Sequence, residues 1–441
     1  MRLVRLALFA SLASLSLPLS AQSEWWVDPV AGADVNPGSI TLPLRTLSFA
    51  CSVAGANDHI HLLPGLYGPA HNGEVLPITL GFGTVQNDLV IRGLGGAVLD
   101  LGGSASTVFR LANGADRLRI TNLTFLNSDQ AGWWTRVISS GSGVNSADAA
   151  SDVELDRCQF VNCNRGIVLW TSDNVQGWKI HDNLFWNLTN DAILEYTGDN
   201  DVYNNTFVTG TYKAYISDST TSRCQNNLIV GYAIGFENNN AANSVARYEH
   251  NWLHQTPIVT QGVGLATALP SSNVIGVDPQ FVGAAAGDFH LQATSPCLDA
   301  GTAAIFARSD LDGVARLVDV DQNGSLLPDI GCYESSPVSM TTSYDPSTQL
   351  MTVQSASTLP GVFTAVLFSF DDGMFPIPGQ GPILVDQATF IPYWLTSAAP
   401  GYWVLNFQGL SLPPGLRLVS HVLGLYTTPV AIGGNQVWTQ L

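Results

Sequence analysis

The chain has 441 residues, of which 46% are hydrophobic and only 12% are charged. Asp and Glu number 35 against 17 Lys and Arg, so the formal net charge is −18 at pH 7. A chain of this length can form two or three domains with separate cores. Its acidic charge repels phosphate backbones and anionic lipids, and binding to nucleic acid is therefore disfavoured.

Residues 1–21 have the composition of a secretory signal peptide. Arg2 and Arg5 precede an apolar run, and small residues follow it near Ala21. This run is too short and too rich in serine to span a membrane, and no later segment reaches an apolar length of ~18 residues. We therefore expect a secreted protein, extracellular or held at the cell surface, without a transmembrane segment.

Residues 25–67 predict a short helix followed by a strand. Pro43 stands at the expected helix start, and the apolar residues that follow at helical spacing, before Gly55, are Leu44, Leu47, Ala50, Cys51 and Ala54. Residues 59–63 alternate between polar and apolar, which indicates a strand. An amphipathic helix at this place would cover the unpaired backbone groups at the open end of a solenoid.

A repeated phrase dominates the middle of the chain. The segments HDNLFWN, YNNTFVT, QNNLIVG and HNWLHQ each place an asparagine two residues before a large apolar residue, at spacings of 22, 22 and 24, and these residues are Asn183, Asn205, Asn227 and Asn251. A fixed period in this range indicates a solenoid whose repeats bury their apolar side chains by stacking. At ~3.3 Å per residue, one repeat suffices for three short strands and three turns.

The column of asparagines has two interpretations. Stacked inward-facing Asn side chains can hydrogen-bond one another and the turn backbone, and this satisfies buried polar groups. The alternative is a row of polar ligands, and we favour the structural interpretation. Cys158 falls in the same column, two residues before Phe160, and is expected to point inward.

The coils are interrupted once and then end. Residues 129–150 break the period with Trp133, Trp134 and a Gly/Ser-rich stretch, either a binding loop or a tolerated surface insertion. After residue 265 the repeat fades. We predict a cap and β-helix over 22–265, a closing segment over 266–336, and a small β-sandwich over 337–441, where short β-rich runs alternate with Pro and Gly.

The two ends of the solenoid resemble known families. The order of an aromatic-Val-Asp opening, Asn36-Pro37-Gly38, Pro43 with Thr46, and Pro64-Gly65-x-Tyr67 resembles the start of secreted right-handed parallel β-helix proteins of the pectate-lyase-like superfamily. Residues 278–279, 289–291, 295–301 and 329–334 resemble the closing segment known as the choice-of-anchor Q domain. The resemblance implies an all-β fold, a right-handed parallel β-helix with an N-terminal cap helix, followed here by a β-sandwich.

The stretch DVDQNGSLLPD is the best-defined metal site in the sequence. Its alternating oxygen-bearing residues around Gly324 match the first half of a calcium loop, and the predicted ligands are Asp319, Asp321, Asn323 and Asp329. Asx-rich turns without an ion are the alternative. We expect a bound Ca²⁺ to be structural rather than catalytic.

The six cysteines are compatible with disulfides in an exported chain. Cys297 and Cys332 lie in one compact, turn-rich stretch, and we predict that they pair. Closing a loop of that length would stabilise the fold by ~4 kcal/mol in the chain-entropy model.

A row of charged residues is the candidate catalytic site. Aligned on the Asn column, Asp191 and Lys213 fall at the same place on adjacent coils, and Arg165 joins them if one residue is dropped. In the polysaccharide lyases that the chain resembles, a base removes the proton beside a uronate carboxylate and a cation neutralises that carboxylate. Lys213 would be the base, with Arg165 or a metal held by Asp191 as the neutralising group. Solvated pairing between coils, worth ~0–1 kcal/mol, is the alternative.

Aromatic residues crowd the same coils and suit stacking against sugar rings, although each could also belong to the core. The candidate substrate-binding residues are Trp133, Trp134, Trp170, Tyr196 and Tyr232. The leading hypothesis is therefore the binding or processing of an extracellular glycan, with lyase-type β-elimination as the reaction if the protein is an enzyme. The competing hypothesis is a non-catalytic surface or adhesion protein whose C-terminal domain docks on a surface or protein partner.

Overall fold

The computed structural model describes the backbone in fifteen ranges, and the other residues are left out of the description. The ranges are 22–104, 107–129, 135–141, 149–170, 175–196, 198–303, 309–316, 326–336, 338–345, 350–357, 363–369, 391–396, 401–408, 417–425 and 436–440.

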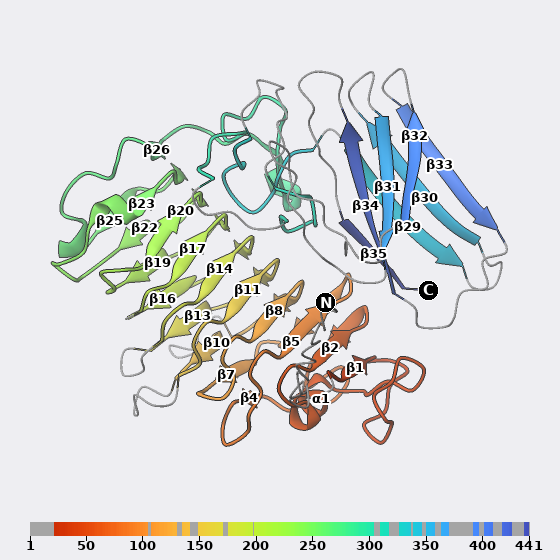
Figure 1. Cartoon of the computed structure of the whole chain (residues 1–441). Coiled ribbons are helices and arrows are strands. Elements are labelled where there is room, and N and C mark those ends of the chain that lie inside the picture. The colour runs from red at the N-terminus through yellow and green to blue at the C-terminus, as the bar shows by residue number, and fades with distance from the viewer. Residues whose placement is uncertain are drawn as a thin grey trace, which may run out of the picture.

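Three parallel sheets wind around one axis, each coil adding one strand to each sheet (Figure 1). Sheet 1 runs in the order β1 (Glu24–Val27), β2 (His59–Leu62), β5 (Val90–Gly93), β8 (Arg119–Thr121), β11 (Glu154–Asp156), β14 (Lys179–His181), β17 (Asp201–Tyr203), β20 (Arg223–Gln225) and β23 (Tyr248–Glu249). Sheet 2 contains β3 (Gly65–Tyr67), β6 (Ala97–Asp100), β9 (Thr124–Leu126), β12 (Gln159–Val161), β15 (Leu184–Trp186), β18 (Thr206–Val208), β21 (Leu228–Val230), β24 (Trp252–His254) and β26 (Val274–Ile275). Sheet 3 contains β4 (Ile78–Leu80), β7 (Phe109–Leu111), β10 (Arg136–Ser140), β13 (Arg165–Leu169), β16 (Ile193–Glu195), β19 (Lys213–Ser217), β22 (Ile234–Glu237) and β25 (Ile258–Gln261). The predicted right-handed parallel β-helix is confirmed.

The tight corner between sheets 1 and 2 recurs in successive coils and helps to keep their length in residues nearly constant. Six coils place a residue with a left-handed backbone there, at φ of 52–59°, and these residues are Asn122, Arg157, Asp182, Asn204, Asn226 and His250. Asn and Asp adopt this conformation more readily than other residues with a side chain. The chain therefore turns within two residues, and the next residue enters the interior.

The interior consists of apolar columns that repeat from coil to coil. The rings of Phe125, Phe160, Phe185 and Phe207 stack in sequence, with centroids 5.0, 4.7 and 4.8 Å apart. All four rings are buried. Stacked aromatic pairs contribute about 0.5–1.5 kcal/mol beyond the burial of their area, so this column holds the coils in register.

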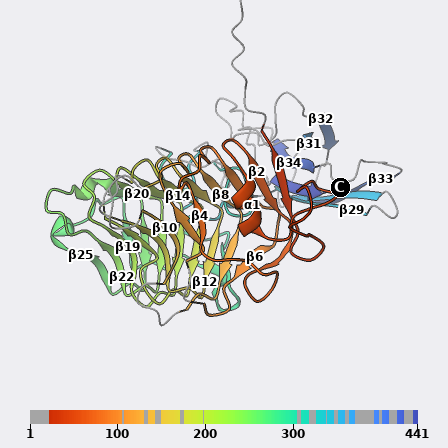
Figure 2. The ribbon, with the colours of Figure 1, turned by 90° about the horizontal axis from the view of Figure 1, so that it is seen from below.

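Helix α1 (Leu47–Val53) lies at the N-terminal end of the solenoid, against β1, β2 and β4 (Figure 2). It begins after Thr46, whose hydroxyl accepts a hydrogen bond from the Phe49 amide at 3.1 Å. The predicted start at Pro43 is wrong. Leu44 instead exchanges backbone hydrogen bonds with Trp26 and Asp28 at 2.8 Å, and it extends the pairing of β1.

The closing segment packs against the outer face of sheet 2. Its hairpin is formed by β27 (Phe281–Gly283) and β28 (Asp288–Leu291), joined by the 3-10 turn η3 (Ala284–Ala286). Phe289, Leu311 and Cys332 lie in one apolar cluster with Leu184 and Val208 of the coils. This segment therefore covers part of sheet 2. The other 3-10 turns are η1 (Val245–Arg247) and η2 (Val263–Leu265).

The described C-terminal residues form two antiparallel sheets, drawn in blue in Figure 1. One has the order β29 (Val338–Asp345), β30 (Leu350–Ser357) and β33 (Gly401–Gln408). The other has the order β32 (Ile391–Thr396), β31 (Phe363–Ser369), β34 (Arg417–Leu425) and β35 (Gln436–Gln440), and β29 contacts β34 and β35 across the two sheets. Among the described residues, no helix has both the length and the apolar character needed to cross a membrane.

Candidate functional site

The predicted catalytic residues lie on adjacent coils of sheet 3. Ile167 pairs with Ile193, and Ile193 pairs with Tyr215. Arg165, Asp191 and Lys213 each stand two residues before one of these partners, so they occupy one level on adjacent coils. The structure thus brings the three residues together.

Each cation of this group has an acidic partner. The Arg165 Nε lies 3.1 Å from Asp191 Oδ2, and the Lys213 Nζ lies 2.9 Å from Glu237 Oε2. We call these four residues the charged row. Each is less than one-tenth exposed, at 8, 4, 8 and 6% for Arg165, Asp191, Lys213 and Glu237.

Glu237 was not found from the sequence. It lies ten residues after Asn227, whereas Asp191 and Lys213 lie eight residues after their own asparagines. An alignment at one fixed offset therefore misses Glu237. Glu237 pairs with Ile216, three residues beyond Lys213, and the long Lys213 side chain reaches across to it. A search for acidic residues further along the following coil would have found Glu237.

The surroundings of Lys213, predicted from the sequence to be the base, favour its charged form. Burial lowers the pKa of its ammonium group, but the hydrogen bond and charge of Glu237 outweigh burial and hold the pKa above its usual value. An ammonium group has no lone pair with which to take a proton. In this arrangement Lys213 is better suited to neutralise an anion than to take a proton.

Asp191 is the more reactive member of the row. Burial raises the pKa of its carboxyl group, and the charges of Arg165 and Lys213 oppose that rise without cancelling it. Its Oδ1 atom is buried and has no hydrogen-bond partner among the residues that the structure describes. A carboxylate with a raised pKa and a free oxygen is a group that can accept or donate a proton.

An aromatic strip runs beside the charged row. Trp170 and Tyr196 follow β13 and β16, and their half-buried rings stack with centroids 5.8 Å apart and planes 14° from parallel. They pack on the small apolar cluster of Val168, Leu194 and Ile216. The strip therefore presents flat apolar side chains on two adjacent coils.

Two cations lie over aromatic rings at this face. The Arg136 guanidinium stands 5.2 Å from the Trp170 ring centre, and the Lys213 Nζ stands 4.5 Å from that of Tyr212. Tyr212 is 41% exposed. Such cation–π contacts fix both partners. Arg136 pairs in register with Arg165 and contacts Trp170, so it links the aromatic strip to the level of the charged row.

Tyr232, predicted to bind substrate, belongs to the core instead. It is fully buried, and its ring meets the edge of Phe207 at 6.1 Å. The ring fills the space left by Gly210, where an added Cβ would lie 2.1 Å from it. Trp133 and Trp134, predicted for the same role, lie outside the described residues.

The predicted asparagine column is a hydrogen-bonded ladder. The backbone amide of each Asn donates to the side-chain oxygen of the Asn one coil later, at 3.0–3.1 Å from Asn183 through Asn205 and Asn227 to Asn251. The last acceptor is Asn273, a fifth member that the spacing of 22 residues after Asn251 could have revealed. Their side-chain amides donate to carbonyl groups inside the coils. The ladder satisfies buried polar groups and leaves no ligand atoms at the surface.

The predicted Cys297–Cys332 disulfide is not formed. All six cysteines are free and buried thiols. Cys332 packs with Phe289 and Leu184, whereas Cys297 packs with Leu228 and Trp252 in a neighbouring apolar cluster. Both thiols therefore act as small apolar groups that attach the closing segment to sheet 2.

Of the predicted calcium ligands, Asp329 alone lies within the described residues. Its carboxylate is fully buried and accepts hydrogen bonds from the backbone amides of Asp299 and Ser335, at 2.8 and 2.7 Å. It therefore holds two loops of the closing segment together. Asp319, Asp321 and Asn323 fall outside the described residues, and the Ca²⁺ site stays a prediction.

The buried Glu195 should make the free energy of unfolding of the protein depend on pH. It points into the solenoid, where Tyr215 donates to it at 2.7 Å and Ser222 donates to its other oxygen. Burial raises its pKa from 4.5 to about 7 despite these hydrogen bonds. The folded state thus holds a proton that the unfolded state has lost, and stability falls as pH rises from about 4.5 to about 7.

Glu195→Gln should therefore stabilise the protein by about 3 kcal/mol at about pH 8, since each pKa unit corresponds to about 1.4 kcal/mol. At about pH 5 the gain should fall below about 1 kcal/mol, because wild-type Glu195 is then still protonated in the fold. Urea denaturation at both pH values measures the difference. An equal gain in the free energy of unfolding at the two pH values would contradict the raised pKa of Glu195.

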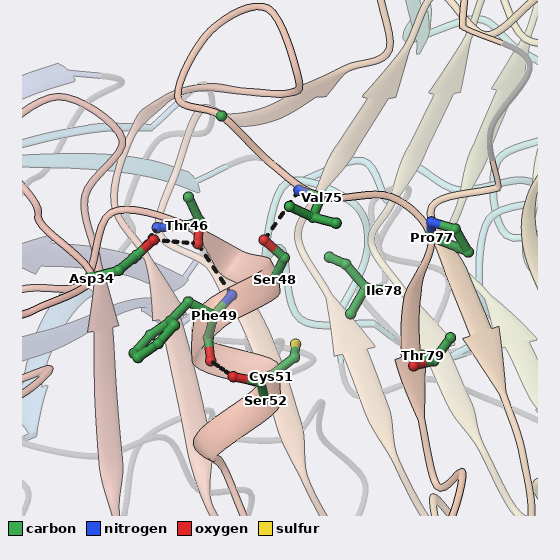
Figure 3. A pocket seen from close by; sticks show the side chains of 11 residues that line it. Asp34, Thr46, Ser48, Phe49, Cys51, Ser52, Val75, Pro77, Ile78 and Thr79 are labelled. Atoms are coloured by element: carbon green, nitrogen blue, oxygen red, sulfur yellow. Dashed lines mark hydrogen bonds between the residues drawn. The ribbon is translucent and has the colours of Figure 1, made fainter.

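The pocket beside helix α1 has a volume of about 370 Å³ (Figure 3). Its polar side chains already serve the local fold. Asp34 accepts from the Thr46 hydroxyl at 2.9 Å, Ser48 accepts from the Val75 amide at 3.2 Å, and Ser52 donates to the Phe49 carbonyl at 2.7 Å. We therefore interpret it as a surface hollow around the helix caps.

Two family models match parts of the chain. "Periplasmic copper-binding protein (NosD)" matches residues 109–276, and "Protein of unknown function (DUF1565)" matches residues 30–131. Each covers less than half of the 441 residues, and both lie within the coils. Among curated proteins there is no match.

Three solved structures share part of the arrangement. Pectate lyase Pel9A has 15% identity and a TM-score of 0.39, over 72% of this chain and 97% of the other. GH136 lacto-N-biosidase from Eubacterium ramulus has 8% identity and a TM-score of 0.34, over 53% and 56%. A rhamnogalacturonan lyase has 12% identity and a TM-score of 0.30, over 59% and 90%. At such scores these likenesses say nothing about the activity of this chain.

Proposed function

We propose that this protein is exported and binds extracellular polysaccharide along the outer face of sheet 3. The stacked Trp170–Tyr196 pair carries the proposal, since its rings lie on adjacent coils beside the charged row. Flat aromatic side chains on a long, regular face suit the apolar faces of sugar rings. The described part of the closing segment packs on sheet 2, and the rings of the aromatic strip are half-buried.

The charge of this face favours an acidic sugar. Burial and the nearby charges of Arg110 and Arg165 lower the pKa of Arg136. Cations thus gather beside Trp170 in a protein whose net charge is −18. A uronate carboxylate would lower the repulsion between these guanidinium groups and accept hydrogen bonds from Arg136, in addition to the contact that Arg165 makes with Asp191. We therefore propose a uronate-containing chain as the ligand.

A lyase-type elimination is the second candidate function, favoured by the raised pKa of Asp191, and it requires the buried Oδ1 of this residue to become exposed to the sugar. Asp191 would take the proton from the carbon beside the uronate carboxylate. The electron pair left behind would form a carbon–carbon double bond as the glycosidic oxygen departs and takes up a proton. Arg165 and Lys213 would neutralise the carboxylate as charge develops on it.

Binding is tested by calorimetric titration with uronate polymers and with neutral polysaccharides. Trp170→Ala should weaken binding about tenfold, the expected cost of one lost aromatic contact. Arg136→Met should weaken binding of uronate polymers only. Phe49→Ala, an exposed aromatic change on helix α1, is the matched control and should bind like the wild type. Unchanged binding by Trp170→Ala would overturn the proposal.

The elimination is tested in the same samples by the ultraviolet absorbance of the unsaturated product. If the reaction occurs, Asp191→Asn should abolish it while binding persists, because the amide keeps the shape and loses the base. Product formation at the wild-type rate by Asp191→Asn would exclude Asp191 as the base. Binding without product from any polymer would rule out the lyase and leave the binding proposal standing.

A further inference from the structure

We infer that Glu24, His59 and His61 form a binding site for a divalent transition-metal ion on the first coil. Strand β1 pairs in parallel with β2, which sets Glu24 opposite His59 and Trp26 opposite His61. Residues two apart on a strand face the same side. Ile60 and Leu62 between and after the histidines enter the core, so both imidazoles lie on the outer face with Glu24.

The distances within this cluster suit a single ion. One ligand atom from each residue can be chosen so that all lie within 4.8 Å of one another. Glu24 Oε1 lies 3.5 Å from His59 Nδ1, and Glu24 Oε2 hydrogen-bonds His61 Nε2. Ligands of a tetrahedral ion at ~2.0–2.2 Å stand about 3.4 Å apart. The Glu24–His59 separation thus matches the one that coordination requires, whereas the direct hydrogen bond between Glu24 and His61 would be replaced by their bonds to the ion.

The cluster is both held in place and open to solvent. His61 is fully buried, and its ring packs on Trp26 with centroids 4.7 Å apart. The side chains of His59 and Glu24 are 24% and 40% exposed. The exposed Gln22 amide lies 2.8 Å from Glu24 Oε1 and 3.0 Å from His59 Nδ1, and a bound ion would displace it. An ion can therefore enter without movement of the strands, and three protein ligands leave at least one position for water.

The donor set selects the kind of ion. Two imidazole nitrogens and one carboxylate suit Zn²⁺ and Cu²⁺, whereas Ca²⁺ prefers six or more oxygen ligands. Cu²⁺ should bind more tightly than Zn²⁺, following the usual order of divalent metals. Arg92 stands opposite His61 on the next coil. Its positive charge weakens the binding of a cation at this site.

This site is separate from the matched family and from the proposed glycan face. The NosD model begins at residue 109, after all three ligands. The aromatic strip belongs to sheet 3, whereas these strands belong to sheet 1. The result of the metal-binding experiment is therefore independent of whether the protein binds a glycan.

Calorimetric titration of the full chain with Cu²⁺, Zn²⁺ and Ca²⁺ tests the inference. In separate titrations, one equivalent of Cu²⁺ or one equivalent of Zn²⁺ should bind to this site. Ca²⁺ should not displace either ion. The electron paramagnetic resonance spectrum of the Cu²⁺ complex should show hyperfine coupling to two nitrogens. Absence of Cu²⁺ and Zn²⁺ binding, or a spectrum without nitrogen coupling, would overturn the inference.

Variants at the two exposed ligands keep the test valid even if changes at buried His61 impair folding. Glu24→Gln and His59→Ala should each weaken Cu²⁺ binding at least about tenfold, and His59→Ala should leave coupling to one nitrogen. His290→Ala is the matched control, since His290 lies 2.6 Å from both Asp288 and Asp312 elsewhere. Unchanged binding by His59→Ala, or equal loss in the control, would contradict the assignment.

Discussion

Replacing Arg316 by methionine is expected to destabilise the protein by about 3–5 kcal/mol, the usual effect of removing one partner of a buried ion pair. The guanidinium is fully buried between the solenoid and the closing segment. It donates to Asp182 at 2.8 Å and to Glu334 at 2.9 Å. It also donates to the Gly331 carbonyl at 2.7 Å. Methionine fills a similar volume but leaves two carboxylates buried without their cation.

The effect should appear as a lower denaturation midpoint, measured by urea unfolding. Arg223→Met is the matched control, because Arg223 makes a similar two-point contact with Asp201 at 2.7 Å but is 46% exposed. That change should cost less than about 1 kcal/mol. Equal losses in the two variants would show that Arg316 does not attach the closing segment.

Asn205→Ala is expected to destabilise the protein by about 3–5 kcal/mol. Asn205 accepts from the Asn183 amide at 3.1 Å and donates to the Ile180 carbonyl at 2.8 Å, and all of these groups are buried. Alanine leaves both backbone groups without a partner, at about 1–3 kcal/mol each. The break in the ladder also removes the bond to Asn227 at 3.1 Å.

Thermal and urea unfolding of Asn205→Ala should be compared with those of Asn243→Ala. Asn243 makes one side-chain hydrogen bond, to the Gly264 carbonyl at 3.0 Å, in a half-buried place outside the ladder. Its loss should cost about 0.5–1.5 kcal/mol. A small effect at Asn205, matching that at Asn243, would contradict the stabilising role of the ladder.

The coil architecture could be predicted because its cause is local and repeated. Asn183, Asn205, Asn227 and Asn251 recur at a nearly constant spacing, and each follows a residue with a left-handed backbone. Two-residue corners and inward asparagines are read directly from such a pattern. The same spacing placed Asp191 and Lys213 at one level, and Arg165 joined them once one residue was dropped.

Contacts that depend on side-chain reach could not be predicted in this way. Lys213 meets Glu237 diagonally across coils, and this pairing favours the charged form of Lys213. Tyr232 enters the core because Gly210, one coil earlier, has no side chain there. Neither effect follows from the periodicity of the chain.

The metal cluster was also beyond the repeat pattern. Glu24 precedes His59 by 35 residues, and helix α1 lies between them in the chain. Only the parallel pairing of β1 with β2 makes the two neighbours. The spacing of the asparagine column begins much later and gives no register for the first coil.

A crystal structure with a bound uronate oligosaccharide would test the proposed glycan face most directly. We predict a sugar ring stacked on Trp170 and Tyr196, with its carboxylate facing Arg136 and the chain running across β13, β16 and β19. An oligosaccharide bound instead to sheet 1 or to the closing segment, with the Trp170–Tyr196 pair uncovered, would contradict the proposed function.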